Sequence, residues 1–168
     1  MLDISLPALA ASDCFRPLPL RQIFSLAAFR TTRPALEAAL GLELPSTPCR
    51  IIHGGAVYLW NGPNAWLVID GDTISEKTAG IAAVTDQSDG LFIFALSGPY
   101  AVRMLKKLVP IDVESFAPDE VAITLAAHVG VRLWREGDDF ILACFRGFAG
   151  ALHHALAEAA QEFLPGRG

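Results

Sequence analysis

The chain has 168 residues, of which 52% are hydrophobic and 18% are charged, and its formal net charge is −5. The 13 Lys and Arg residues are scattered and form no basic stripe, which excludes a typical nucleic-acid-binding surface. The charged fraction is below the roughly 25% of an average globular protein. This composition favours a subunit with an apolar contact surface, and a monomer with an alanine-rich core stays open as the alternative.

Three cysteines, Cys14, Cys49 and Cys144, are widely spaced and form no Cys-x-x-Cys pair, so we expect neither a disulfide framework nor a zinc ribbon. A reducing cytoplasm fits this pattern. No stretch approaches the roughly 18 apolar residues of a membrane span, and the N-terminus lacks the basic region of a signal peptide. We therefore expect a cytoplasmic protein with no membrane segment.

The first elements follow an expected N-terminal arm at residues 1–19. Residues 20–29 (LRQIFSLAAF) are apolar over the length of a strand. Thr32 can then cap a helix in which Pro34 suits the first turn and Gly41 the left-handed end.

Residues 57–70 (VYLWNGPNAWLVID) read as a hairpin, because two apolar runs flank the turn-forming residues 61–64. Trp60 stands before this turn and Trp66 after it. Behind the hairpin, the Thr73 and Glu76 spacing of a capping box predicts a helix over residues 74–83.

The second half of the chain predicts a similar series of elements. Residues 91–96 (LFIFAL) have the length of a buried strand, and Ser97 is expected to cap the helix that follows. After an acidic loop, residues 121–127 predict a strand, and residues 129–134 and 140–145 predict a hairpin. A final helix is expected to bury one apolar stripe, formed by Phe148, Leu152, Leu156, Ala159 and Phe163.

The two halves resemble each other. Trp60 and Trp134 are 74 positions apart, as are Trp66 and Phe140, and each pair flanks a turn. We expect an α+β protein of two similar packed units with antiparallel sheets and helices on one face of each. The expected organisation is an arm at residues 1–19, units at 20–84 and 85–164, and a tail at 165–168.

No group of residues points to catalysis by this chain. The four histidines are not spaced as metal ligands, and surface or capping roles are expected for them. Ser97 lies outside a G-x-S-x-G elbow, and Cys144 lies in an apolar strand where a buried, inert thiol is expected. The acidic residues are expected to be solvated loop residues. The pair Gly54-Gly55 matches no phosphate-binding glycine motif. The histidines are His53, His128, His153 and His154, and the acidic residues are the carboxylates of residues 112–120 and 138–139.

Three motifs nevertheless resemble the gamma subunit of heterotetrameric sarcosine oxidase. The first is a Leu-Pro-x-x-Pro lead followed by Trp-x-Gly-Pro-x-x-Trp-Leu. The second is D-Q-S-D-G with L-S-G-P and P-I-D. The third is FILACFRGFAG, in which Gly147 replaces the family's serine. The matching residues are Leu44, Pro45, Pro48, Trp60, Gly62, Pro63, Trp66, Leu67, Asp86, Ser88, Ser97, Gly98, Pro99, Pro110, Ile111, Asp112 and the segment 140–148.

The resemblance implies the fold of the aminomethyltransferase folate-binding domain. It also implies a noncatalytic subunit of a flavoenzyme complex that demethylates sarcosine oxidatively to glycine. FAD, FMN, NAD and tetrahydrofolate would belong to the large partner subunits, and this chain would bind none of them. A stand-alone folate- or pterin-binding module is the alternative. The oligomeric state of the isolated chain stays open.

If the chain is such a subunit, exposed parts of Trp60, Trp66 and Trp134 are candidate anchors for a partner, because tryptophan is enriched among interface hot spots. The alternative is that all three tryptophans belong to the core.

Overall fold

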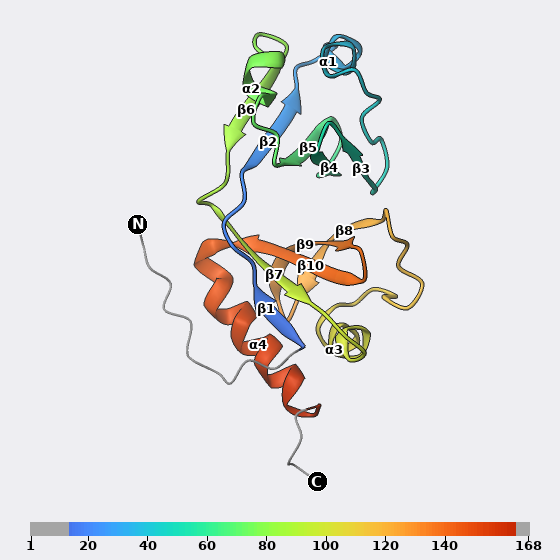
Figure 1. The fold of residues 1–168 in the computed structure, drawn as a ribbon, viewed down its shortest axis with the longest axis vertical. Coiled ribbons are helices and arrows are strands. Elements are labelled where there is room, and N and C mark those ends of the chain that lie inside the picture. Colours follow the sequence, from blue (N-terminus) through green and yellow to red (C-terminus); the bar gives the residue numbers. More distant parts are fainter. Residues whose placement is uncertain (1–13, 164–168) are drawn as a thin grey trace. The chain divides into compact units, whose positions relative to one another are not determined.

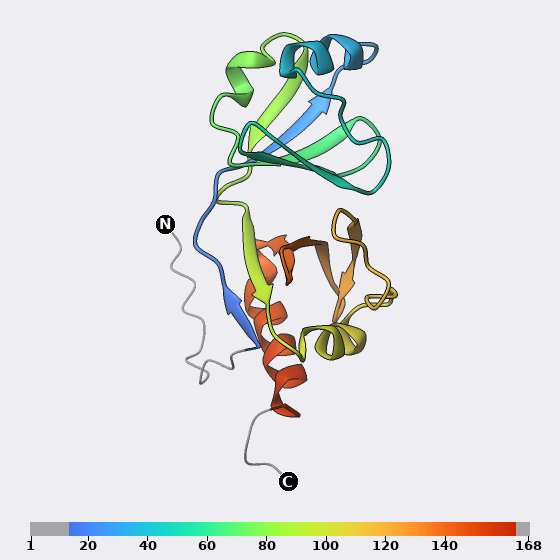
Figure 2. The same cartoon turned by 45° about the vertical axis from the view of Figure 1, so that its right-hand side comes forward.

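The structure, a computed structural model, describes residues 14–163. The described chain forms two α+β units, each built on a five-stranded sheet (Figures 1 and 2). The first unit comprises residues 20–91 and 119–122, and the second comprises residues 14–19, 92–118 and 123–163. The predicted α+β class with two similar units is confirmed. The tail at 165–168 and most of the expected arm lie outside the described residues.

The first unit has the strand order β3-β4-β5-β2-β6, and all four of its strand pairs are antiparallel. The turn of the predicted hairpin is formed by residues 61–64, in which Gly62 and Asn64 have positive φ. The elements are β2 (Ile23–Ala28), α1 (Arg33–Leu40), β3 (Arg50–His53), β4 (Ala56–Trp60), β5 (Ala65–Ile69), α2 (Ile74–Lys77) and β6 (Ala82–Asp86).

Both helices of the first unit contribute to the core on one face of its sheet. Leu36 and Leu40 of α1 and Ile74 of α2 pack in the same cluster as Trp66 and Val68 of β5. Burying a large aliphatic or aromatic side chain stabilises a fold by about 1.5–3 kcal/mol. The helices are therefore held mainly by this shared apolar cluster.

The helix α1 follows its sequence signals closely. A proline occupies its first turn, and it ends at Gly41, whose φ of 69° is left-handed. Thr32 stands at the N-cap position, but its side chain makes no capping bond. Its hydroxyl oxygen lies within hydrogen-bond distance of the carbonyls of Ile81 (2.7 Å) and Phe29 (2.9 Å), which share its single proton. The threonine thus joins the start of α1 to the segment that leads into β6.

The prediction of a helix over residues 74–83 is wrong. The helix α2 ends at Lys77, and the expected capping box does not form, since the side chain of the N-cap Thr73 makes no capping hydrogen bond. Gly80 then adopts a φ of 79°, which is left-handed. The chain continues as β6, in which Val84 pairs with Leu26 of β2. Pairing with a distant strand therefore overrides the local helix signal.

The second unit has the strand order β1-β7-β10-β9-β8. Its strand β1 pairs antiparallel with β7, and β10 pairs antiparallel with β9. The elements are β1 (Phe15–Pro17), β7 (Leu91–Leu96), α3 (Ala101–Leu108), β8 (Val121–Ala126), β9 (Val129–Glu136), β10 (Asp139–Phe145), the short helix η1 (Arg146–Phe148) and α4 (Ala149–Gln161).

The internal repeat is visible in the connections. The first unit runs β2, α1, β3, β4, β5, α2, β6, and the second runs β7, α3, β8, β9, β10, α4. In the second sheet β1 takes the place that β6 has in the first. Residues 15–17, expected to belong to an arm, are therefore a strand of the second unit, in which Phe15 pairs with Leu96.

The helices of the second unit differ from the sequence interpretation in two places. Ser97 does not cap α3, whose N-cap residue is Tyr100. Phe148, expected in the buried stripe of the last helix, is 56% exposed. It lies in η1, before the regular turns of α4 in which Leu152 and Leu156 are buried. None of the helices in the described part of the chain has the length and apolar character needed to cross a membrane.

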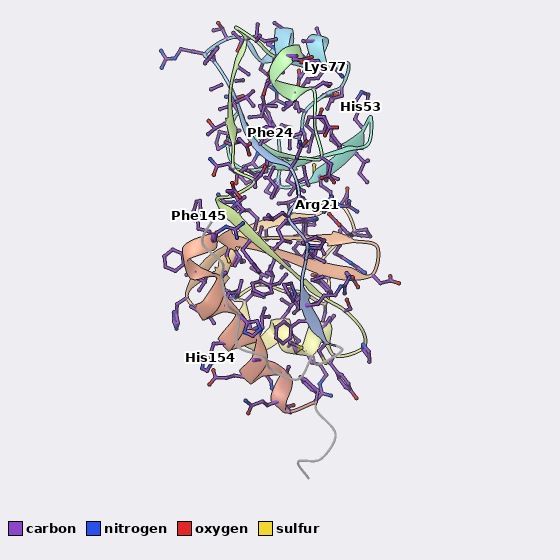
Figure 3. The ribbon with its side chains drawn as sticks, turned by 60° about the vertical axis from the view of Figure 1, so that its left-hand side comes forward. Arg21, Phe24, His53, Lys77, Phe145 and His154 are labelled. Carbon is purple, nitrogen blue, oxygen red and sulfur yellow. The ribbon has the colours of Figure 1, made fainter. Side chains whose placement is uncertain are left out.

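The two neighbouring histidines of α4 lie in different environments. His154 projects from the surface and lies 3.5 Å from Glu158 (Figure 3). His153 is buried against the rings of Phe15 and Phe94. The expected surface role is therefore wrong for His153, because the helical rotation of about 100° per residue turns it toward the sheet.

Candidate functional site

The tryptophans predicted as interface anchors are distributed between core and surface. Trp66 and Trp134 are 0% and 1% exposed, respectively, so neither side chain is available to a partner in this conformation. Trp66 and Trp134 therefore belong to the core, which was the alternative interpretation of the tryptophans. Trp60 is half-buried and pairs with Trp66 across β4 and β5. Only Trp60 stays a candidate anchor.

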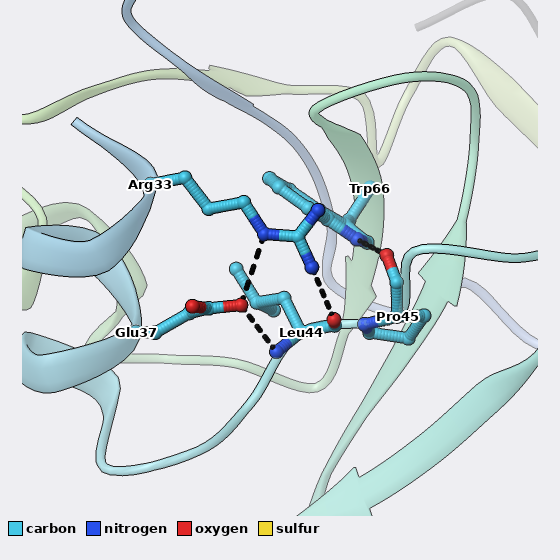
Figure 4. A network of polar contacts seen from close by, with 5 residues as sticks. All are labelled: Arg33, Glu37, Leu44, Pro45 and Trp66. Atoms are coloured by element: carbon cyan, nitrogen blue, oxygen red, sulfur yellow. Dashed lines mark hydrogen bonds and ion pairs between the residues drawn. The ribbon is translucent and has the colours of Figure 1, made fainter. Parts of the chain in front are cut away.

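A polar network explains why the Leu-Pro lead accompanies Trp66 (Figure 4). The indole Nε1 of Trp66 donates to the Pro45 carbonyl at 2.8 Å. Arg33 lies over the indole ring, 5.5 Å from its centroid, and donates to the Leu44 carbonyl at 2.7 Å. Glu37 Oε1 accepts from Arg33 Nε and from the Leu44 amide, each at 3.0 Å. These bonds attach the loop after α1 to the hairpin, so this motif has a structural role.

The D-Q-S-D-G motif forms the turn between β6 and β7. The Ser88 hydroxyl accepts from the Ile23 amide at 3.0 Å, and the Ser88 amide donates to Asp86 Oδ1 at 2.8 Å. Hydrogen bonds from Ser88, chiefly from its side chain, hold the pKa of Asp86 below its ordinary value. Asp86 is therefore an ionised turn residue with no character of a general acid or base.

The L-S-G-P and P-I-D motifs are also turns. Ser97 Oγ accepts from Arg16 Nη1 at 2.6 Å, and a second guanidinium nitrogen of Arg16 lies 3.0 Å from Asp139 Oδ2. Asp112 accepts from the Ser115 hydroxyl at 2.8 Å and from the Glu114 amide. These bonds hold the pKa of Asp112 below its ordinary value. In these two motifs Ser97 and Asp112 therefore form local hydrogen bonds of the fold.

Two groups with chemical potential lie in the core of the second unit. Burial raises the pKa of the Cys144 thiol to about 11, which leaves it protonated and unreactive at neutral pH. Burial and, to a smaller extent, His154 lower the pKa of His153. Within residues 14–163, no group of three or more His, Cys, Asp or Glu side chains is arranged to hold a metal ion.

A small polar pocket lies in the first unit, beside α2. We call it the α2 pocket; its volume is about 250 Å³. Tyr58 reaches it from β4, His53 from the end of β3 and Lys77 from α2, and the latter two are labelled in Figure 3. The loop between β5 and α2 forms one side of it. Its lining consists of His53, Gly54, Ala56, Tyr58, Asp70, Gly71, Asp72, Thr73, Ile74 and Lys77.

A larger apolar depression of about 470 Å³ lies in the second unit, between the end of α3 and β8. Leu125 of β8 lines it with Leu108 and Pro110, and Lys107 and His128 provide the charged or titratable groups. Ile123 and Leu125 are both about half exposed on one face of β8, the terminal strand of the sheet. We call Leu108, Pro110, Ile123 and Leu125 the β8 surface.

The sequence motifs did not identify either pocket. The sequence signal for the α2 pocket was the run Asp-Gly-Asp at residues 70–72, directly after the buried strand β5. Tyr58 carried no signal, because an aromatic residue inside an apolar run is normally part of the core.

Searches with protein-family models and against curated proteins found no match. Among solved structures, a chain of heterotetrameric sarcosine oxidase from Corynebacterium sp. U-96, solved in complex with pyrrole 2-carboxylate, is 26% identical with a TM-score of 0.79. The match covers 92% of this chain and 86% of that chain.

The glycine cleavage system aminomethyltransferase T from Bartonella henselae matches at 14% identity with a TM-score of 0.64, over 84% of this chain and 44% of that chain. This match shows the fold, and the present chain spans less than half of that enzyme. The chain therefore has an aminomethyltransferase-like fold and is similar, over most of its length, to a chain of heterotetrameric sarcosine oxidase.

Proposed function

We propose that this chain is a noncatalytic, gamma-type subunit of a heterotetrameric, sarcosine-oxidase-like flavoenzyme complex. The observation that carries the proposal is the reciprocal match with the sarcosine oxidase chain, which covers 92% of one chain and 86% of the other. A chain that corresponded to one domain of a large subunit would cover only a part of its counterpart, as it does in the aminomethyltransferase.

The roles of the motif residues support this proposal. Trp66, Ser88 and Ser97 resemble the family in sequence, and in the structure each one holds backbone or loop segments together. The residues shared with the family therefore stabilise the fold and do not form a reactive site. This suits a chain whose role is to bind partner subunits.

The β8 surface supports an assembly role as well. Half-exposed Leu125 lines an apolar depression, and half-exposed Ile123 lies on the same face of β8, the terminal strand of the sheet. Grouped exposed apolar side chains are typical of protein contact sites, and the end strand of a sheet is a common place of association. We propose that a large subunit covers this surface.

In the proposed complex, sarcosine is oxidised to glycine on the partner chains, and FAD, FMN, NAD and tetrahydrofolate are bound there. We further propose a cytoplasmic location, which the three free cysteines suit. The contribution of this chain is to bind and position its partners.

Coexpression with candidate flavin-bearing chains encoded beside it tests the proposal. A tag on this chain should recover stoichiometric partners in a yellow eluate that oxidises sarcosine. The double variant Ile123→Thr/Leu125→Thr should recover much less partner, because it removes the apolar contact, while threonine is β-branched and suited to a strand. Recovery of this chain alone, while the partners are soluble, would contradict the proposal.

The matched control for this experiment is Ile52→Thr. Ile52 is 64% exposed on β3, the strand of the first unit that corresponds to β8. If Ile52→Thr recovers the partners as well as the unaltered chain does, the loss of an exposed apolar side chain elsewhere does not by itself weaken the assembly. Equal losses in both variants would refute the assignment to the β8 surface.

A stand-alone folate-binding module is the alternative, and fold similarity supports it. The pteridine ring of a folate needs polar partners for its edge, whereas the depression beside α3 has a mainly apolar lining. Tetrahydrofolate should therefore leave the melting temperature of the isolated chain unchanged. A rise with ligand concentration would favour the folate-binding module instead.

A further inference from the structure

The outer edge of β8 presents backbone amides that have no strand to pair with. β8 is the terminal strand of the second sheet, so β9 lies on one side of it and no strand of the described chain lies on the other. The Val121 amide donates to the Pro48 carbonyl, which lies outside β9, at 3.1 Å. Because successive amides of an antiparallel strand point to alternate sides, the amides of Ile123 and Leu125 also point away from β9.

The two ends of this edge are satisfied, and its middle is not. Beyond the bond of Val121 at one end, the Ala127 amide at the other end donates to the Leu108 carbonyl of α3 at 2.9 Å. Within residues 14–163, no backbone bond or bridge is made to the outer side of Ile123 or Leu125. The amide and the carbonyl of each of these two residues point to the same side. They can therefore pair with an extended backbone from outside the chain.

β8 lacks the features that protect the other terminal strands. Free sheet edges are commonly protected by shortness, by charged residues or by proline. β1 has three residues and ends at Pro17, β3 has four residues and begins at Arg50, and β6 ends at Asp86. β8 has six residues (VAITLA), none of which is charged or a proline. Among the terminal strands of the two described sheets, β8 is therefore the one suited to accept another strand.

Apolar surface accompanies the open edge. Ile123 and Leu125, whose amides point outward, are 49% and 52% exposed. Leu125 also lines the depression of about 470 Å³ together with Leu108 and Pro110. When a peptide adds to a sheet edge, its main chain supplies the hydrogen bonds and every second side chain projects to the same face. Apolar side chains on one face of an added strand would thus contact the β8 surface.

We infer that a large partner subunit contributes an extended segment that pairs with the outer edge of β8 and adds a strand to the five-stranded second sheet. The backbone of this segment bonds to the backbone of Ile123 and Leu125, and its side chains on the face of the β8 surface are apolar. The inference rests on the proposed function, because it specifies how a partner covers the β8 surface.

Hydrogen exchange resolved to single amides tests the inference. In the isolated full-length chain, the amides of Ile123 and Leu125 should exchange fast, whereas those of Ala122 and Thr124, which point toward β9, should be protected. In the complex recovered by coexpression, Ile123 and Leu125 should exchange about tenfold or more slowly than in the isolated chain, because each then donates to a backbone carbonyl.

The outcomes separate this inference from the proposed function. If the complex forms and exchange at Ile123 and Leu125 does not slow, the strand pairing is refuted and the proposed function is unaffected. If no larger chain is recovered, the proposed function fails and the inference fails with it. Protection of Ile123 and Leu125 in the isolated chain would also overturn the inference, and protection that rises with chain concentration would assign the edge to a second copy of this chain.

A proline substitution separates the backbone bond from the side-chain contact. Ile123→Pro removes the outward amide hydrogen, and an edge strand tolerates proline where the amide faces away from the sheet. Ile123→Thr is the matched control, because it also removes the apolar side chain but retains the amide. Ile123→Pro should recover about three- to tenfold less partner than Ile123→Thr, the effect of one lost hydrogen bond. Equal recovery by the two folded variants would refute the strand pairing, and the exchange experiment decides the inference if Ile123→Pro does not fold.

Discussion

Replacing Trp66 by phenylalanine removes the indole N–H that donates to the buried Pro45 carbonyl at 2.8 Å. A buried carbonyl left without its donor costs about 1–3 kcal/mol. The smaller ring also leaves unfilled volume in a fully buried site and loses part of the contact with Arg33, which adds about 1 kcal/mol. We therefore expect the free energy of unfolding to fall by about 2–4 kcal/mol, a large share of the roughly 5–15 kcal/mol of an ordinary domain.

Urea unfolding followed by far-ultraviolet circular dichroism measures this change independently of tryptophan fluorescence. If the two units unfold in separate steps, the lower stability should appear in the step of the first unit. Trp60→Phe is the matched control, because Trp60 lies on the opposite strand of the same hairpin and is half-buried. We expect this control to cost at most about 1 kcal/mol. Equal losses in the two variants, or a loss below about 0.5 kcal/mol for Trp66→Phe, would refute the structural role assigned to the indole N–H.

Three further predictions concern buried groups. Tyr58→Phe should leave the free energy of unfolding unchanged to within about 0.5 kcal/mol, because the hydroxyl opens to the α2 pocket and bonds none of the described residues; a clear loss in urea unfolding would mean that the hydroxyl is bonded. His153 has a lowered pKa in the fold, so the unfolded chain binds the proton more readily, and stability should fall as the pH decreases below about 6.5. A shallower fall in His153→Phe would confirm this source, and an identical pH profile would exclude it. A thiol reagent at pH 8 should label half-buried Cys49 in the native chain and Cys144 only after unfolding; fast native labelling that persists in Cys49→Ser would contradict this order.

The elements that depend on neighbouring residues were predictable from the sequence. Pro34 and Gly41 delimit α1, and the residues between Trp60 and Trp66 form the turn of their hairpin, because turn and cap geometry is decided by a few adjacent residues. The 74-residue offset between the two hairpins also predicted the internal repeat. The fold class followed from these local features.

The errors arose where distant segments decide the structure. Residues 82–86 follow the short helix α2 in the sequence, and they form a strand because their backbone pairs with β2. Phe15 pairs with Leu96, 81 positions away, a contact that no local pattern contains. Burial in the folded chain also decided which tryptophan can contact a partner. Trp60 and Trp66 both flank the same turn in the sequence, but only Trp60 is partly exposed.

Native mass spectrometry of the complex recovered through a tag on this chain tests the proposed function most directly. The proposal predicts an assembly that contains this 18.0 kDa chain in a fixed ratio to larger, flavin-bearing chains. It also predicts that the larger chains are no longer recovered with this chain when Ile123 and Leu125 are both replaced by threonine. Detection of only the free 18.0 kDa chain or its homo-oligomers, from cells in which the larger chains are soluble, would contradict it.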